Sequence, residues 1–126
     1  MKKYLFLTLT ALVSLVFASC SKKDDAPAKS SHKVVFKAQT SSDSRIEVAV
    51  YGYDTKITTA SSLSGSTWTS PELTVPAGTA VANVSVNGIG VNASSSLKVQ
   101  IFVDGVMKSE GTSTGEALSA GASFQF

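Results

Sequence analysis

The sequence predicts an all-β protein: a small antiparallel β-sandwich of immunoglobulin-like size with about seven strands, preceded by an N-terminal signal peptide and a flexible tether. From residue 33 onward, apolar and polar residues alternate with a period of two, which is typical of half-buried strands. Clusters of Gly, Ser, Asn and Pro interrupt this alternation at the spacing expected for turns. No window has a helical stripe, so the crossover helices that a parallel sheet requires are not expected.

Residues 1–19 have the layout of a secretory signal peptide. Lys2 and Lys3 precede an apolar run over residues 4–17, and two small residues then lead to Cys20. A membrane-spanning helix needs about 20 apolar residues, and this run is several residues too short. We therefore expect a signal peptide at 1–19, a tether at 20–32 and one β-sandwich domain at 33–126.

The tetrapeptide Phe17-Ala18-Ser19-Cys20 resembles a bacterial lipobox, with Phe where Leu is commoner. The resemblance implies cleavage before Cys20, a thioether-linked diacylglycerol on its sulfur and an N-acyl chain on its amine. No other cofactor is expected. A lipid also explains a single cysteine in an exported protein, where an unpaired thiol is otherwise a liability. The alternative is an unmodified small residue of the signal helix.

The tether that follows, SKKDDAPAKSS, is charged, small or turn-forming and has no apolar periodicity. Such a composition predicts a flexible spacer. Lys23-Asp24-Asp25 resembles the lipoprotein export signal of Bacteroidota, which implies an address at the outer face of the outer membrane. A periplasm-facing anchor is the alternative, and ordinary solvated linker charges are the simpler interpretation of these residues.

The charge of the chain excludes one class of partner. The full chain carries 11 Lys and Arg against 9 Asp and Glu, for a net charge of +2. Removal of the signal peptide takes away Lys2 and Lys3, so the mature protein is close to neutral. Nucleic acid and anionic lipid are bound through clustered positive charge, which is missing here. We therefore expect no nucleic-acid partner.

Three segments, 33–40, 45–53 and 97–104, give the strongest strand patterns. Alternation predicts one inward face on each, formed respectively by Val34, Phe36 and Ala38, by Ile46, Val48 and Val50, and by Leu97, Val99, Ile101 and Val103. Weaker strands are predicted at 56–60, 67–75, 79–86, 106–109 and 117–126. Asp104-Gly105 predicts a two-residue type I′ hairpin. Pro76-Ala77-Gly78 predicts a turn.

The sequence around Trp68, the segment LTVPAGT over 73–79 and the segment LKVQIFVDGV over 97–106 resemble the MmpS-like transport accessory domain. The similarity covers roughly residues 33–126 of what would be a small Bacteroidota-type lipoprotein. It implies a membrane-anchored β-sandwich, and mycobacterial members assist large transporters that export lipids and siderophores. The anchor here would be a lipid rather than a helix, and segment 87–96 is richer in Gly and Asn than the family pattern.

Residues able to perform catalysis are few. His32 is the only histidine and lies at the junction of tether and domain, the acids are scattered singly, and no phosphate-binding loop opens a helix. We therefore expect no enzyme activity and no metal site. Tyr51 and Tyr53 are predicted to share the face opposite Ile46, where they could contact a ligand or partner or simply pack on neighbouring strands.

Two other features complete the predicted surface and core. Trp68 is predicted to fill the core. The segment 88–96 is predicted to be a long loop of the kind that often carries binding residues.

These expectations combine into a lipid-anchored cell-envelope lipoprotein that carries a non-enzymatic binding or accessory module. The membrane would be a partner through the anchor, and a second partner would be an envelope protein. One alternative is an accessory subunit of a membrane transporter. Another is an adhesin or structural surface subunit that pairs through exposed sheet edges.

Overall fold

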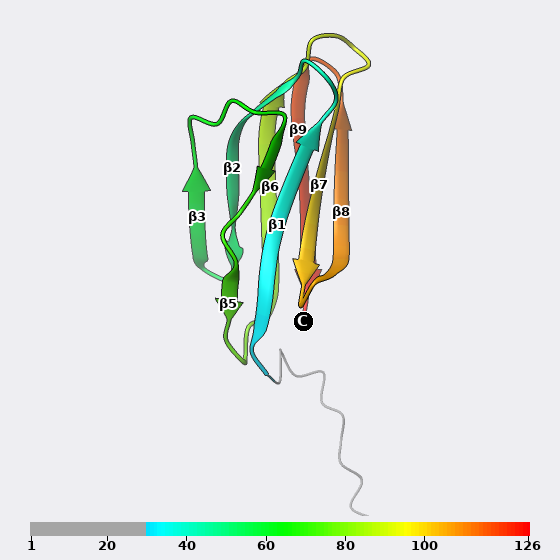
Figure 1. The fold of residues 1–126 in the computed structure, drawn as a ribbon. Coiled ribbons are helices and arrows are strands. Elements are labelled where there is room, and N and C mark those ends of the chain that lie inside the picture. The colour runs from blue at the N-terminus through cyan, green and yellow to red at the C-terminus, as the bar shows by residue number, and fades with distance from the viewer. Residues whose placement is uncertain (1–29) are drawn as a thin grey trace, which may run out of the picture.

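The computed structural model describes residues 30–126, which form nine antiparallel strands in two sheets (Figure 1). The predicted signal peptide, Cys20, Lys23, Asp24 and Asp25 lie outside these residues. The strands are β1 (His32–Thr40), β2 (Arg45–Tyr53), β3 (Lys56–Ala60), β4 (Thr67–Thr69), β5 (Leu73–Val75), β6 (Val81–Ile89), β7 (Ser96–Val103), β8 (Val106–Thr114) and β9 (Ala117–Gln125).

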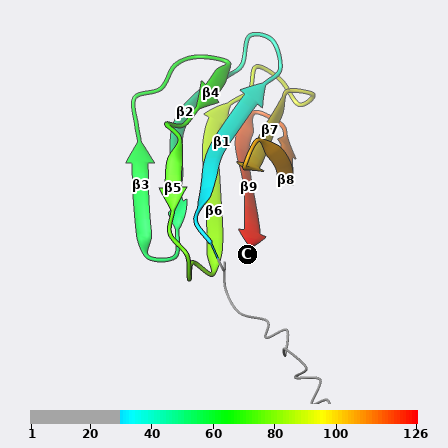
Figure 2. The same cartoon turned by 60° about the horizontal axis from the view of Figure 1, so that its bottom comes forward.

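One sheet has the order β4-β1-β7-β8, with β5 also pairing with β1, and the other has the order β3-β2-β6-β9. The two sheets face each other, so the predicted antiparallel sandwich is confirmed (Figures 1 and 2). The structure has nine strands rather than about seven, and two of them, β4 and β5, are only three residues long. The consecutive strands β1 and β2 lie in different sheets, so the chain crosses the sandwich at its first turn.

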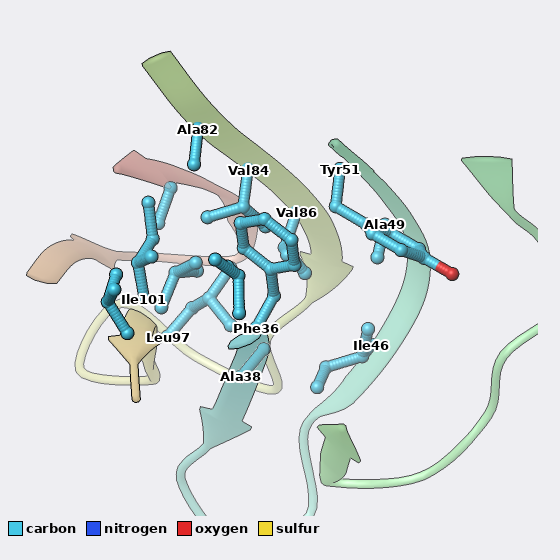
Figure 3. Packing of buried hydrophobic residues seen from close by; sticks show 14 of the residues in the cluster. Phe36, Ala38, Ile46, Ala49, Tyr51, Ala82, Val84, Val86, Leu97 and Ile101 are labelled. Atoms are coloured by element: carbon cyan, nitrogen blue, oxygen red, sulfur yellow. The ribbon is translucent and has the colours of Figure 1, made fainter. Parts of the chain in front are cut away.

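The core fills the space between the sheets (Figure 3). Phe36 of β1 lies at its centre and is fully buried, as are Ile46 of β2 and Leu97 of β7. Small residues of the second sheet, such as Ala49 and Ala82, oppose these larger side chains. This combination of large and small residues lets the two inner faces interdigitate at close range.

Strands β1 and β7 follow their predicted alternation. Val34, Phe36 and Ala38 are buried, and so are the four predicted inward residues of β7. The two strands pair along seven positions, from Val34 with Val103 to Thr40 with Leu97. Both predictions are confirmed. Alternation holds here because the pairing of β1 with β7 contains no bulge.

The predicted inward face of β2 is wrong beyond Ile46. The pairing of β2 with β6 shifts between Ile46 and Val48, so Glu47 is an extra residue in the strand. A bulge of this kind moves all later side chains to the opposite face. Ala49 and Tyr51 are consequently buried, while Val48 and Val50 are half-buried on the other side.

The segment 67–75 forms two short strands instead of one. Ser70 lies between them and is buried, with its amide donating to the Phe36 carbonyl at 2.9 Å and its hydroxyl accepting from the Phe36 amide at 3.0 Å. Pro71 follows and has no amide hydrogen to continue the ladder. Ser70 therefore keeps this segment hydrogen-bonded to β1 across the break, through its amide and its hydroxyl.

The predicted long loop at 88–96 is shorter than expected, because β6 continues to Ile89. The remaining residues 90–95 are held by Ser95, whose hydroxyl accepts hydrogen bonds from the amides of Val91 and Asn92 at 2.9 and 3.1 Å. Gly90 donates to the Glu116 carbonyl at 2.7 Å. The segment is thus a compact turn fastened to the β8–β9 connection.

The two sheets come very close where β8 faces β9. A methyl group built on Gly111 of β8 would lie 1.9 Å from the Gly121 carbonyl oxygen of β9. Only glycine allows this approach of two backbones.

Within residues 30–126, no helix is long and apolar enough to cross a membrane.

Candidate functional site

The end of the sandwich at which β1 begins, here called the proximal end, gathers five chain segments. They are the start of β1, the β2–β3 turn at Asp54, the β5–β6 connection at residues 76–80, the β7–β8 turn at Asp104, and the C-terminal residue Phe126. The opposite end, called the distal end, carries the connections at residues 41–44, 61–66, 90–95 and 115–116. Figure 1 shows the C-terminus at the proximal end.

Asp104 fastens the β7–β8 turn to the start of β1. Asp104 and Gly105 both have positive φ, 51° and 82°, as the predicted type I′ hairpin requires. The Asp104 carboxylate accepts a hydrogen bond from His32 Nδ1 at 2.6 Å and another from the Lys33 amide at 2.9 Å. The bond from His32, and then that from Lys33, lowers the pKa of Asp104 below its ordinary value of 3.8.

Asp54 likewise fastens a turn to a neighbouring segment: it joins the β2–β3 turn of the other sheet to the start of β6. It also has a positive φ, 47°, and its carboxylate accepts hydrogen bonds from the amides of Ala80 and Val81, both at 3.1 Å. The Ala80 carbonyl in turn accepts from the Phe126 amide at 3.0 Å. Two turn aspartates therefore join the connections of both sheets at the proximal end.

An aromatic group joins the two halves of this network. The His32 ring stacks on Phe126 with centroids 5.3 Å apart, and Phe126 meets Phe124 edge-on at 5.1 Å. Sequence reasoning missed these contacts, because His32 lies 72 residues from Asp104 and far from Phe126. His32, expected at an exposed junction of tether and domain, is half-buried and makes both contacts.

An apolar strip lies on the outer face of the first sheet near the proximal end. Val35 of β1 pairs with Phe102 of β7, and Phe102 pairs with Met107 of β8. Val35 and Phe102 are half-buried, whereas Met107 is 46% exposed and its neighbour Val106 is 55% exposed. Lys37 Nζ lies 4.7 Å from the centre of the Phe102 ring, a cation–π distance.

The distal end has one shallow polar hollow of about 230 Å³, lined by Gln39, Thr40, Ser41, Ser96 and Lys98. It lies where β1 ends and β7 begins, and Ser41 Oγ accepts the Ser96 amide at 2.9 Å. Its open shape and polar lining suit weak hydrogen bonding to a polar surface, because specific small-molecule sites are deeper and mostly apolar.

The predicted exposed pair Tyr51 and Tyr53 does not exist as an exposed pair. Tyr51 is only 5% exposed and packs between Phe36 and Trp68, with ring centroids at 5.4 and 5.1 Å. Tyr53 is half-buried and packs against the same core. The bulge at Glu47 turns both rings inward. Trp68 is half-buried and also packs on the core.

The acids of the described domain do not converge. Glu47 pairs with Arg45 at 3.1 Å, Glu110 accepts from Gln100 at 2.8 Å, and Glu72 lies 4.0 Å from Lys33. Within residues 30–126, no group of three or more His, Cys, Asp or Glu side chains could hold a metal ion. The acids named here therefore each contact one neighbouring side chain, and the two turn aspartates hold backbone amides.

No family model matches the chain, and a search of curated proteins finds no significant match.

Proposed function

We propose that this protein is a cell-envelope lipoprotein, anchored by lipid on Cys20, whose β-sandwich is a non-enzymatic binding or accessory module. The observation that carries the proposal is the position of the only cysteine. It lies directly after an apolar run and two small residues, and directly before a charged segment. The first strand of the domain then begins at His32, twelve residues further along the chain.

The domain supports the module half of the proposal. Its histidine and most of its acids already hold backbone amides or neighbouring side chains. In the described residues these groups are spread over separate turns and strand pairs, whereas catalysis needs several such groups to converge on one place. The distal end, with its polar hollow and turns, lies opposite His32, where the first strand begins, and is the part of the domain we expect to meet a partner.

The test of the anchor is a Cys20→Ser variant compared with a matched Ser21→Ala variant. We expect the wild type and Ser21→Ala to incorporate labelled fatty acid and to fractionate with membranes. Cys20→Ser should take up no label and leave the membrane fraction while still yielding a folded domain. Lipid labelling of Cys20→Ser, or its full retention in membranes, would contradict the anchor.

We further propose that Lys23-Asp24-Asp25 directs the protein to the outer face of the outer membrane. A double variant, Asp24→Ala with Asp25→Ala, keeps the lipid site and removes only the acidic part of the address. Protease treatment of intact cells should cut the tether of the wild type and release its domain, and should spare this variant. Equal protection of the two proteins would favour the periplasm-facing alternative.

A second candidate is an accessory subunit of a membrane transporter. The observation in its favour is that the segments resembling the MmpS-like domain lie together in one sheet, since β5 and β7 pair with opposite edges of β1. Purification of the lipidated protein from solubilised membranes would then recover a large integral membrane protein in a fixed ratio. Recovery of the lipoprotein by itself under several mild detergents would exclude this candidate.

A further inference from the structure

We propose that the proximal end touches the lipid bilayer through the β7–β8 hairpin, with Val106 and Met107 as the side chains that enter the membrane interface. This inference rests on the proposed lipid anchor at Cys20. The contact would hold the sandwich upright and present its distal end away from the membrane.

The length of chain between anchor and domain limits where the bilayer can be. His32 lies twelve positions after Cys20 in the chain, a span of at most about 43 Å when fully extended. A flexible chain of this length has an end-to-end distance of only about 20 Å. The nine-residue strands are about 30 Å long, so on average the bilayer lies closer to His32 than the distal end does.

The hairpin is fixed beside the point at which the tether reaches the domain. Asp104 forms two hydrogen bonds with the Lys33 backbone: its amide donates to the Lys33 carbonyl at 2.7 Å, and its side-chain carboxylate accepts from the Lys33 amide at 2.9 Å. Val106 and Met107 follow this turn directly and are about half exposed. Ile57 is also 50% exposed at this end, but it lies on β3 at the edge of the other sheet, whereas Val106 and Met107 follow the turn that is bonded to Lys33. We therefore expect the anchor to bring Val106 and Met107 to the bilayer.

The chemistry of the patch is apolar rather than ionic. Met107 continues the half-buried strip of Val35 and Phe102, so the contact would extend an existing apolar surface. The nearby cations have partners that offset most of their charge: Lys33 lies 4.0 Å from Glu72, the charge of Lys108 helps to lower the pKa of Asp104, and Lys37 Nζ lies 4.7 Å from the centre of the Phe102 ring. Attraction to anionic lipid is consequently weak, and the contact should form on zwitterionic lipid and persist at high salt.

The experiment uses the full lipidated protein, labelled with ¹⁵N and ²H, in phosphatidylcholine nanodiscs that contain a gadolinium-chelating lipid. Paramagnetic broadening of each amide reports its distance from the bilayer. Across a domain about 30 Å long, we expect amides 104–108 to lose at least about threefold more intensity than amides 90–95. The ratio should be the same at low and high salt.

Two variants make the test specific. Val106→Ser with Met107→Ser should reduce the difference between the two ends by half or more. Ile89→Ser with Val91→Ser removes two similarly exposed aliphatic side chains at the distal end and should leave the wild-type pattern unchanged.

Equal broadening at the two ends of a wild-type protein that floats with the lipid would overturn the bilayer contact alone and favour a protein partner at this hairpin. A wild-type protein that carries no lipid and does not float would overturn both the anchor and the contact.

Discussion

Asp104 accepts two hydrogen bonds on its exposed carboxylate, from His32 and from the Lys33 amide, and its own backbone forms a turn with positive φ. The two hydrogen bonds stabilise the ionised form and lower its pKa below the ordinary value of 3.8. A carboxyl with a lowered folded pKa contributes stability that is complete above its unfolded pKa. That contribution is lost as the pH falls through the folded value.

We therefore expect an Asp104→Asn variant to differ from the wild type in its response to acid. Between about pH 7 and pH 3, the melting temperature of the wild type should fall further than that of the variant, because only the wild type loses an ionised carboxylate at this turn. Thermal unfolding followed by circular dichroism at several pH values measures the difference. Parallel curves for the two proteins would show that the carboxylate charge does not stabilise the turn.

Tyr51 occupies a core position, between Phe36 and Trp68. Removal of its ring leaves a cavity, and we expect Tyr51→Ala to lower the free energy of unfolding by about 3–5 kcal/mol. Tyr53→Ala is the matched control, since Tyr53 is only half-buried, and it should cost clearly less. Chemical denaturation of both variants gives the comparison. If both changes cost little, both rings would lie on the outer face, in the register that simple alternation predicts.

At the scale of strands, the closest approach lies between β8 and β9. A side chain on Gly111 would collide with the backbone of Gly121, which cannot move aside as a flexible side chain can. Gly111→Ala should destabilise the domain by about 1–3 kcal/mol. Gly65→Ala, where the added methyl finds ordinary contact distances, should change stability by no more than about 1 kcal/mol in either direction. Equal stability of the two variants would mean that the sheets are further apart at this edge.

Local patterns were enough to predict a strand wherever its register is unbroken. The alternation in β1 and β7 places their core residues correctly, and Asp104-Gly105 correctly predicts a hairpin. In β2 the same reasoning fails, because the bulge at Glu47 depends on its partner strand. At the bulge, the Arg45 carbonyl oxygen lies close to Gly88 of β6. A Cβ atom on residue 88 would be only 2.4 Å from that oxygen, so glycine leaves the room that the bulge needs.

The proximal network lies beyond what a single sequence can predict. His32, Asp104 and Phe126 are brought together by the order of strands in the two sheets, and their spacing along the chain carries no local signal. The apolar strip of Val35, Phe102 and Met107 has the same origin, because cross-strand pairing alone makes these residues neighbours. The sequence pattern did not indicate the order of the strands in the two sheets.

At the scale of the whole molecule, the tether and the domain should differ in their resistance to protease. Trypsin should cleave the purified protein rapidly after Lys22, Lys23 and Lys29 and leave a stable fragment that begins at Ser30. The lysines of β1 should resist, since that strand is paired on both sides. Mass spectrometry of a digestion time course identifies the cuts. Early cleavage at Lys33 or Lys37 would contradict an ordered β1.

Intact mass spectrometry of the protein purified from membranes of its native host tests the proposed anchor at Cys20. We expect a mature chain that begins at Cys20 and carries a diacylglycerol thioether together with an amide-linked acyl chain. A chain that begins elsewhere, or that contains Cys20 with an unmodified thiol, would contradict it.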